Sequence, residues 1–173
     1  MATTQHNFIT ESNTLALLVF TVGDQTYGIP VTNVVRIIEM VTITYLPGAP
    51  DTIKGIINLQ GNTVPIIDLR HRFNASTQNY GLNTPIILVN ANNTGQILGL
   101  ISDTVNDVIH IPDSNLEMFE MVMPAKLAEQ VTTQAAYLAG MTKFKGQIIL
   151  ILNVEAVLNY TEQVNLSKVL DTQ

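Results

Sequence analysis

The chain alternates between short apolar runs, rich in β-branched residues, and short turns rich in Gly, Asn and Asp. Residues 15–22 form a continuous apolar run, residues 23–24 (Gly-Asp) are a turn signal, and residues 26–31 form a second run. A similar unit spans residues 56–69, around the Gln-Gly-Asn turn at 60–62. Apolar runs of this length around such turns are typical of β-hairpins. The pattern therefore predicts strands as the main element.

Short helical turns are predicted where a polar residue stands just before an apolar segment. Side-chain oxygens of Thr, Asp and Asn accept hydrogen bonds from the first free N–H groups of a helix. Four positions have this pattern: Thr32 before residues 33–37, Asp68 before 69–73, Asp103 before 104–109 and Asn153 before 154–158.

The same pattern occurs twice in the chain. The segment around Gly28 matches the segment around Gly99 at an offset of 71 residues, and the segment from Gly55 matches the segment from Gly140 at an offset of 85. The 14 extra residues fall between Ile109 and Leu138. Self-similarity at a fixed offset indicates a repeated structural unit, so we expect two copies of one small fold.

Each copy is predicted to be a small, curled β-sheet that closes into a barrel, because glycines recur where a strand bends or turns. The prediction is a mainly β protein with two five-stranded barrels side by side and short helices. The expected limits are a flexible arm at 1–14, a domain at 15–160 and a C-terminal tail at 161–173. Within the domain we expect subdomains at about 15–80 and 81–160, an insertion at about 112–136, and terminal strands free to cross between barrels.

Charged side chains are scarce: 22 of 173 residues, or 13%, are Asp, Glu, Lys or Arg, about half the usual share near 25%. The formal net charge is −6, and residues 81–173 carry nine acidic and four basic side chains. Nucleic-acid binding needs basic clusters, so we expect no nucleic-acid partner. The acidic half is either a solvated face or a docking surface for a basic partner.

Little in the sequence points to catalysis. The chain has no cysteine, and its three histidines, His6, His71 and His110, lack the spacing of metal ligands. Asp68 and Asp103 are better explained as helix caps than as an acid–base pair. No phosphate loop or nucleophile motif is found. We therefore predict no enzyme activity, no cofactor and no metal, and infer a binding module.

The targeting signals of the sequence are equally plain. The longest apolar runs are far shorter than the ~20 residues that cross a bilayer. The first basic side chain is Arg36, so the positively charged start of a secretory signal is missing. These features predict a cytoplasmic protein without direct membrane insertion.

Five ordered stretches resemble the CheW family of chemotaxis coupling proteins, and the resemblance extends over about residues 15–160. These stretches are Leu18–Gly23, Tyr27–Val31, Leu46–Pro50, Ile53–Leu59 and Val64–Arg70. The resemblance implies two SH3-like β-barrels around a shared core. It also implies a non-catalytic, cytoplasmic adaptor in a two-component signalling system, located with receptor arrays at the inner membrane.

The resemblance implies two partners, the cytoplasmic tips of chemoreceptors and the regulatory domain of a CheA-type histidine kinase, with self-association in arrays left open. By position, the expected receptor-binding residues are Val34, Arg36, Gly55, Asn58, Gln60 and Gly61. The expected kinase-binding residues are Leu17, Val19, Thr21 and Tyr27. Backbone geometry also explains Gly55, Asn58 and Gly61, and core packing also explains Val34.

Two positions depart from the family pattern. The family usually has Glu where this chain has Arg36 and Arg where it has Gln60. Loss of a surface ion pair changes stability by only ~0–1 kcal/mol, but a reversed charge discriminates strongly between partners. We therefore hypothesise a divergent pathway. The alternative function is a kinase-regulatory β-domain, or a variant adaptor of another two-component pathway, that does not bind receptors.

Overall fold

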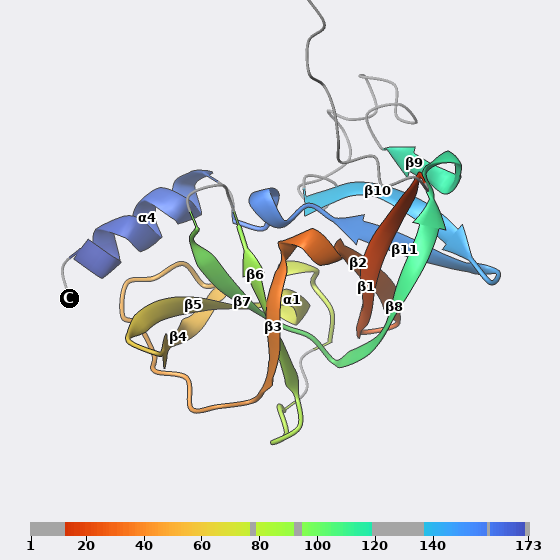
Figure 1. Ribbon diagram of the computed structural model, residues 1–173. Coiled ribbons are helices and arrows are strands. Elements are labelled where there is room, and N and C mark those ends of the chain that lie inside the picture. The colour runs from red at the N-terminus through yellow and green to blue at the C-terminus, as the bar shows by residue number, and fades with distance from the viewer. Residues whose placement is uncertain (1–12, 77–78, 92–94, 119–136, 159, 172–173) are drawn as a thin grey trace, which may run out of the picture.

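A computed structural model describes residues 13–76, 79–91, 95–118, 137–158 and 160–171. Almost all of the predicted N-terminal arm and most of the predicted insertion lie outside these residues. The described chain is mainly β-structure, as predicted, with two sheets and few helices (Figure 1).

Most of the described elements are strands, and each hairpin turns at a glycine-containing segment. The strands are β1 (Thr14–Val22), β2 (Gln25–Pro30), β3 (Val34–Glu39), β4 (Ile53–Leu59), β5 (Asn62–Asp68), β6 (Pro85–Asn90), β7 (Ile97–Ile101), β8 (Thr104–Pro112), β9 (Leu116–Met118), β10 (Leu138–Phe144) and β11 (Gln147–Leu152). The helical elements are α1 (Leu69–Arg72), α4 (Tyr160–Asp171) and three 3-10 turns, η1 (Val31–Asn33), η2 (Asp113–Asn115) and η4 (Val154–Ala156).

The strands form two sheets, which we call barrel A and barrel B. Barrel A has the order β8-β1-β2-β11-β10-β9, and barrel B has the order β3-β6-β7-β5-β4. In Figure 1 barrel B lies on the left and barrel A on the right. Barrel A therefore has a sixth strand, β9, where the sequence predicted five.

The internal repeat is confirmed strand by strand. Strands β4 and β5 match β10 and β11 at the predicted offset of 85 residues, and β2 and β3 match β7 and β8 at 71. Gly28 pairs with Ile151 across a parallel contact, and Gly99 pairs in the same way with Ile66. Read through this correspondence, both barrels have the same strand order.

The two barrels exchange strands. β1 and β2 pair with β8 and β11 in barrel A, and β6 and β7 pair with β3 and β5 in barrel B. Each barrel thus combines the first two strands of one repeat with the later strands of the other. The predicted division of the chain at about residue 80 consequently does not coincide with the division between the barrels.

Three apolar clusters hold the fold together. The largest lies between the barrels and combines residues from both sheets, including Phe20, Tyr27, Ile87 and Leu100. Barrel B has its own interior cluster, with Ile66, Ile86 and Leu88 among six buried residues, and barrel A has a smaller one of Leu17, Ile111 and Ile151. The shared cluster fits the core that the family resemblance implied.

Two of the four predicted helical turns are wrong. Residues 34–39 and 104–112 are the strands β3 and β8, not helical turns. These segments are rich in Val and Ile, whose branched side chains favour the extended backbone of a sheet, and each pairs with a neighbour, β6 or β1. The capped turn after Asp68 is confirmed: the Asp68 carboxylate accepts a hydrogen bond from the Arg70 N–H at 3.0 Å.

At the fourth position η4 forms, but Asn153 makes no side-chain capping bond. The segment expected to be a C-terminal tail contains α4. Leu166 of this helix is buried in the shared core, and Val169 and Leu170 pack against it. Tertiary packing therefore stabilises a helix that the sequence pattern did not reveal.

Candidate partner-binding site

The outermost strand of barrel B, β3, has an exposed and largely apolar surface. Val35 and Ile37 are 44% and 42% exposed, and Arg36 and Glu39 are exposed beside them. The ladder with β6 shifts register between Val34 and Arg36, so β3 carries a bulge at Val35. Val34 itself is only partly exposed and packs against the shared core, in line with its core-packing interpretation.

The apolar surface continues beyond the end of β3. Val41 is 45% exposed and Tyr45 is 74% exposed. Exposed apolar clusters of this kind mark interaction sites. The sequence interpretation missed Val35, Ile37, Val41 and Tyr45 because it assigned a helical turn to residues 33–37. The alternation of the strand would have identified the first two.

The turn between β4 and β5 presents polar groups on the same barrel. Gln60 and Gly61 have φ angles of 52° and 86°, the left-handed values that a tight hairpin turn requires. The Asn58 side-chain oxygen accepts a hydrogen bond from the Gly61 N–H at 2.9 Å. All three residues are exposed. Asn58 therefore supports the turn and still lies on the surface.

Gly55 has a structural task instead. A bridge between Thr44 and Ile56, with hydrogen bonds of 2.9 and 2.8 Å, joins the chain beyond β3 to β4 and closes barrel B. Gly55 is buried at this closure with φ 153°, and a Cβ atom there would overlap the Thr44 carbonyl oxygen. The bridge is antiparallel, so β4 beyond Ile56 runs back toward the end of β3. Of the six expected receptor-binding residues, Gly55 alone is buried.

The four expected kinase-binding residues lie on β1 and β2, in the middle of barrel A. Leu17, Val19 and Tyr27 are buried, at 0%, 6% and 7% exposure. Tyr27 stacks between Phe20 and Phe73, with ring centroids 5.7 and 4.6 Å away. Contact through these three side chains is therefore not supported. Thr21 is partly exposed, and its hydroxyl lies 2.5 Å from the Thr104 hydroxyl.

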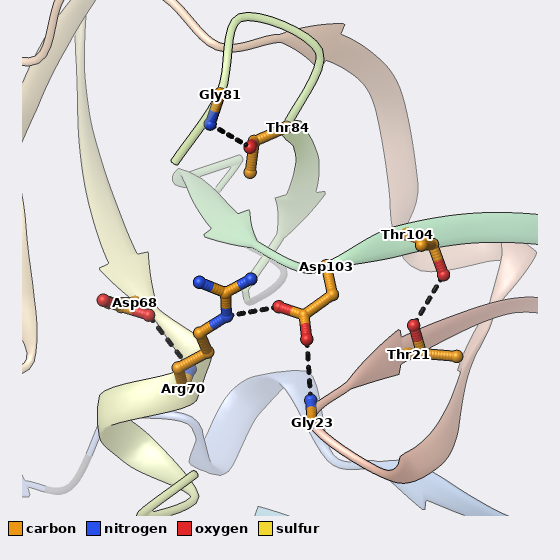
Figure 2. A network of polar contacts seen from close by, with 8 residues as sticks. All are labelled: Thr21, Gly23, Asp68, Arg70, Gly81, Thr84, Asp103 and Thr104. Atoms are coloured by element: carbon orange, nitrogen blue, oxygen red, sulfur yellow. Dashed lines mark hydrogen bonds and ion pairs between the residues drawn. The ribbon is translucent and has the colours of Figure 1, made fainter. Parts of the chain in front are cut away.

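A polar network joins the two barrels beside Thr21 (Figure 2). The Arg70 Nε donates to one oxygen of Asp103, and the Gly23 N–H donates to the other at 2.8 Å. Arg70 belongs to α1 of barrel B, Gly23 to the first turn of barrel A, and Asp103 to the crossing between them. The side chains are 7% and 20% exposed. This ion pair was not predicted, since Arg70 and Asp103 lie 33 residues apart.

Tyr80 covers this network. Its ring lies 5.1 Å from the Arg70 guanidinium and 5.6 Å from the Lys54 ammonium. Burial, and then a hydrogen bond to Asp68, raise the pKa of the Tyr80 hydroxyl above its ordinary value of 10.0. Both effects favour the neutral phenol. The segment between β5 and β6 is thereby held against barrel B.

The described residues offer no arrangement for chemistry. They contain no group of three or more His, Cys, Asp or Glu side chains that could hold a metal ion. No helix among them is long and apolar enough to cross a membrane. The prominent features are instead an exposed apolar strand, a polar turn and two rigidly joined barrels. They define a protein-binding adaptor of the two-barrel class.

Comparisons with known proteins identify the family. The model of the CheW-like domain matches residues 16–162. The chemotaxis protein CheW of Klebsiella aerogenes is 32% identical over 145 residues, 84% of this chain and 82% of that protein. The Myxococcus xanthus protein FrzA is 27% identical over 154 residues, 88% and 83% of the two chains.

A solved structure agrees. The scaffolding protein TtCheW from Thermoanaerobacter tengcongensis has a TM-score of 0.73 and 31% identity, over 86% of this chain and 94% of that chain. The chain therefore belongs to the CheW family and is a chemotaxis coupling adaptor. The alternative of a kinase-regulatory domain is not favoured, because the matched relatives are CheW proteins and a CheW scaffold over most of their length.

Proposed function

We propose that this adaptor joins the cytoplasmic tips of chemoreceptors to the regulatory domain of a CheA-type histidine kinase, without catalysis of its own. The observation that carries the receptor side of this proposal is the exposed β3 edge of barrel B, at the position where the family resemblance expects receptor contact. It is supported by the exposure of Val35, Arg36 and Ile37 on one strand. We place the protein in the cytoplasm, at receptor arrays.

On the receptor side, the proposed surface contains Val34 and Arg36 on β3 and Asn58, Gln60 and Gly61 at the β4–β5 turn. Gly55 contributes indirectly, through closure of the barrel. A cation between two exposed apolar residues suits an apolar partner surface that carries an acidic side chain. The expected receptor tip is therefore one with a carboxylate opposite Arg36. This requirement would account for a divergent pathway.

On the kinase side, the proposed surface is the exposed end of the β1–β2 hairpin, with Thr21 and the turn at Gly23 and Asp24. Leu17, Val19 and Tyr27 would support this surface from the core. The hydrogen bond between Asp103 and Gly23 fixes the turn relative to barrel B. Kinase and receptor contacts would then lie on different barrels, so variants can separate them.

Reconstitution with the cognate kinase and a receptor signalling fragment tests the proposal. We expect this chain to increase receptor control of kinase activity. Arg36→Glu should reduce receptor binding at least about tenfold and leave kinase binding unchanged. Lys143→Glu, which makes the same change in net charge on an exposed strand of barrel A, is the matched control. Kinase regulation that is the same with and without this chain would refute the proposal.

A second arm tests the divergent-pathway hypothesis with the receptor tips and kinase of a standard chemotaxis system. We expect weak binding by the natural chain and stronger binding by the double variant Arg36→Glu with Gln60→Arg. Strong binding by the natural chain, unaltered in the double variant, would show that these two positions do not set partner choice.

A further inference from the structure

The internal repeat gives barrel A and barrel B an equivalent free edge. β3 is the outermost strand of barrel B, and its repeat counterpart β8 is the outermost strand of barrel A. Both ladders shift register at the same place, between Val34 and Arg36 on β3 and opposite Leu18 to Phe20 on β8. The two edges therefore have similar backbone shapes. An unpaired edge is a template for another strand.

Both edges also expose apolar side chains at equivalent positions. Ile37 of β3 is 42% exposed, and its counterpart Val108 of β8 is 43% exposed. Each pairs with a buried residue of the shared core on the inner side, Ile87 and Leu18 respectively. The exposed apolar surface is thus confined to the outer margin of each sheet.

The charges at equivalent positions are opposite. Arg36 of β3 corresponds to Asp107 of β8, and Glu39 corresponds to His110. All four side chains are exposed. The Asp107 carboxylate accepts a hydrogen bond from the Val108 N–H at 2.8 Å. Among the described residues, the salt bridge found is Arg70 with Asp103, so neither Arg36 nor Asp107 is neutralised by an ion pair within this part of the chain.

We propose that β3 of one molecule docks against β8 of a second copy of this chain. This arrangement places Arg36 opposite Asp107 and brings Ile37 and Val108 into one apolar contact. Pairing of two β3 edges would oppose two Arg36 side chains, and pairing of two β8 edges would oppose two Asp107 side chains. Like charges at an interface disfavour such arrangements. The charge pattern therefore selects the unlike pair of edges.

The contact has a regulatory consequence, which rests on the proposed function. The β3 edge is also the proposed receptor-binding surface, so self-association and receptor binding would exclude each other. One strand edge from each molecule is small compared with the ~1,600 Å² of a typical stable interface. We therefore expect weak association, with a dissociation constant on the order of 100 µM, that weakens further at high salt.

Sedimentation velocity of the full chain, from about 10 µM to about 1 mM, tests the proposal. We expect natural protein to associate reversibly, and Arg36→Asp and Asp107→Arg each to weaken self-association at least about tenfold. A one-to-one mixture of the two variants should associate again, because each supplies the charge that the other needs. Lys143→Asp and Asp51→Arg repeat the changes in net charge elsewhere on the exposed surface and should behave as natural protein.

The outcomes are decisive in either direction. Rescue in the mixture, with unaffected controls, supports the contact. A natural chain that stays monomeric up to about 1 mM, single variants that associate normally, or a mixture that stays monomeric would each overturn it. If a charge reversal unfolds the chain, judged by circular dichroism, Arg36→Gln and Asp107→Asn remove each charge more mildly. Because no receptor or kinase is present, failure here is distinct from failure of the proposed function.

Discussion

The ends of β5 and β11 are equivalent in the repeat, yet they are stabilised by different chemistry. In barrel B the strand ends at Asp68, which caps α1, and is followed by the buried residues Arg70 and Arg72. In barrel A the equivalent residues are Asn153, without a capping bond, Glu155 and Val157. Glu155 is exposed and Val157 is fully buried.

The buried arginine of barrel B has specific partners. Arg72 donates to the Tyr137 hydroxyl at 2.7 Å and to the Thr52 hydroxyl at 3.2 Å, and its guanidinium lies 4.6 Å from the Tyr137 ring. At the same place in barrel A, Val157 belongs to the shared apolar core. The comparison teaches that the repeat preserves strand order and bulges, whereas the polar contacts that join the barrels were built on one side only.

The largest effect is expected at the closures of the two barrels. Gly55→Ala should lower the free energy of unfolding by about 3–5 kcal/mol, because a Cβ would overlap the Thr44 carbonyl and the backbone would be strained. Gly140→Ala should cost about 2–3 kcal/mol, since its Cβ would lie 2.5 Å from the Glu117 carbonyl oxygen without positive φ. Urea unfolding measures both.

Gly81→Ala is the control, because nothing lies within 4 Å of a Cβ there. We expect a change within about 0.5 kcal/mol. Equal losses for Gly55→Ala and Gly140→Ala would show that overlap, rather than backbone strain, dominates at both closures.

The next effect concerns the ion pair that barrel A lacks. Asp103→Asn and Arg70→Met should each cost about 2–3 kcal/mol, because either change leaves a largely buried group without its partner. The double variant should cost less than the sum of the two, with a coupling energy of about 1–3 kcal/mol. Glu155→Gln, at the exposed position equivalent to Arg70, should be neutral within about 0.5 kcal/mol. Strict additivity would argue against a direct interaction.

A smaller difference is expected between the two caps. Asp68→Ala should destabilise the protein by about 1–2 kcal/mol, because the Arg70 N–H and the Tyr80 hydroxyl lose their acceptor. Asn153→Ala should cost only a few tenths of a kcal/mol, about the change for a cap without a side-chain bond. Thermal unfolding compares the pair, and a larger loss for Asn153→Ala would reverse the assignment.

The smallest effect is a loss of stability at alkaline pH. The pKa of Tyr80 is raised in the folded state, so the unfolded chain releases this proton first, near pH 10.0. Stability from this group is complete below that pH and decreases above it. Burial also raises the pKa of Tyr27, in the shared core. Tyr80→Phe should therefore make the alkaline decrease shallower without removing it, as measured by urea midpoints from about pH 8 to about pH 10.5.

Much of the local structure could be predicted. The hairpins around Gly23 and Gly61 were expected, because turn residues and apolar runs act over a few neighbouring positions. The repeat was expected for the same reason. The turn proposed at residues 33–37 failed because capping signals are weak beside the pairing of β3 with β6. For the candidate site, Arg36 and Gln60 were correctly expected at the surface, whereas Leu17, Val19 and Tyr27 are buried.

By itself, the sequence determined the strands, most turns and the existence of two equivalent units. These features depend on side-chain alternation and backbone preference, which act locally. Tertiary structure alone decided that the barrels exchange their first two strands. Strand β1 thereby lies between β8 and β2, and its apolar side chains are buried on both faces. Strand pairing joins residues far apart in the chain, so the same apolar run can be an exposed edge or a buried centre. Only the neighbours in space decide which.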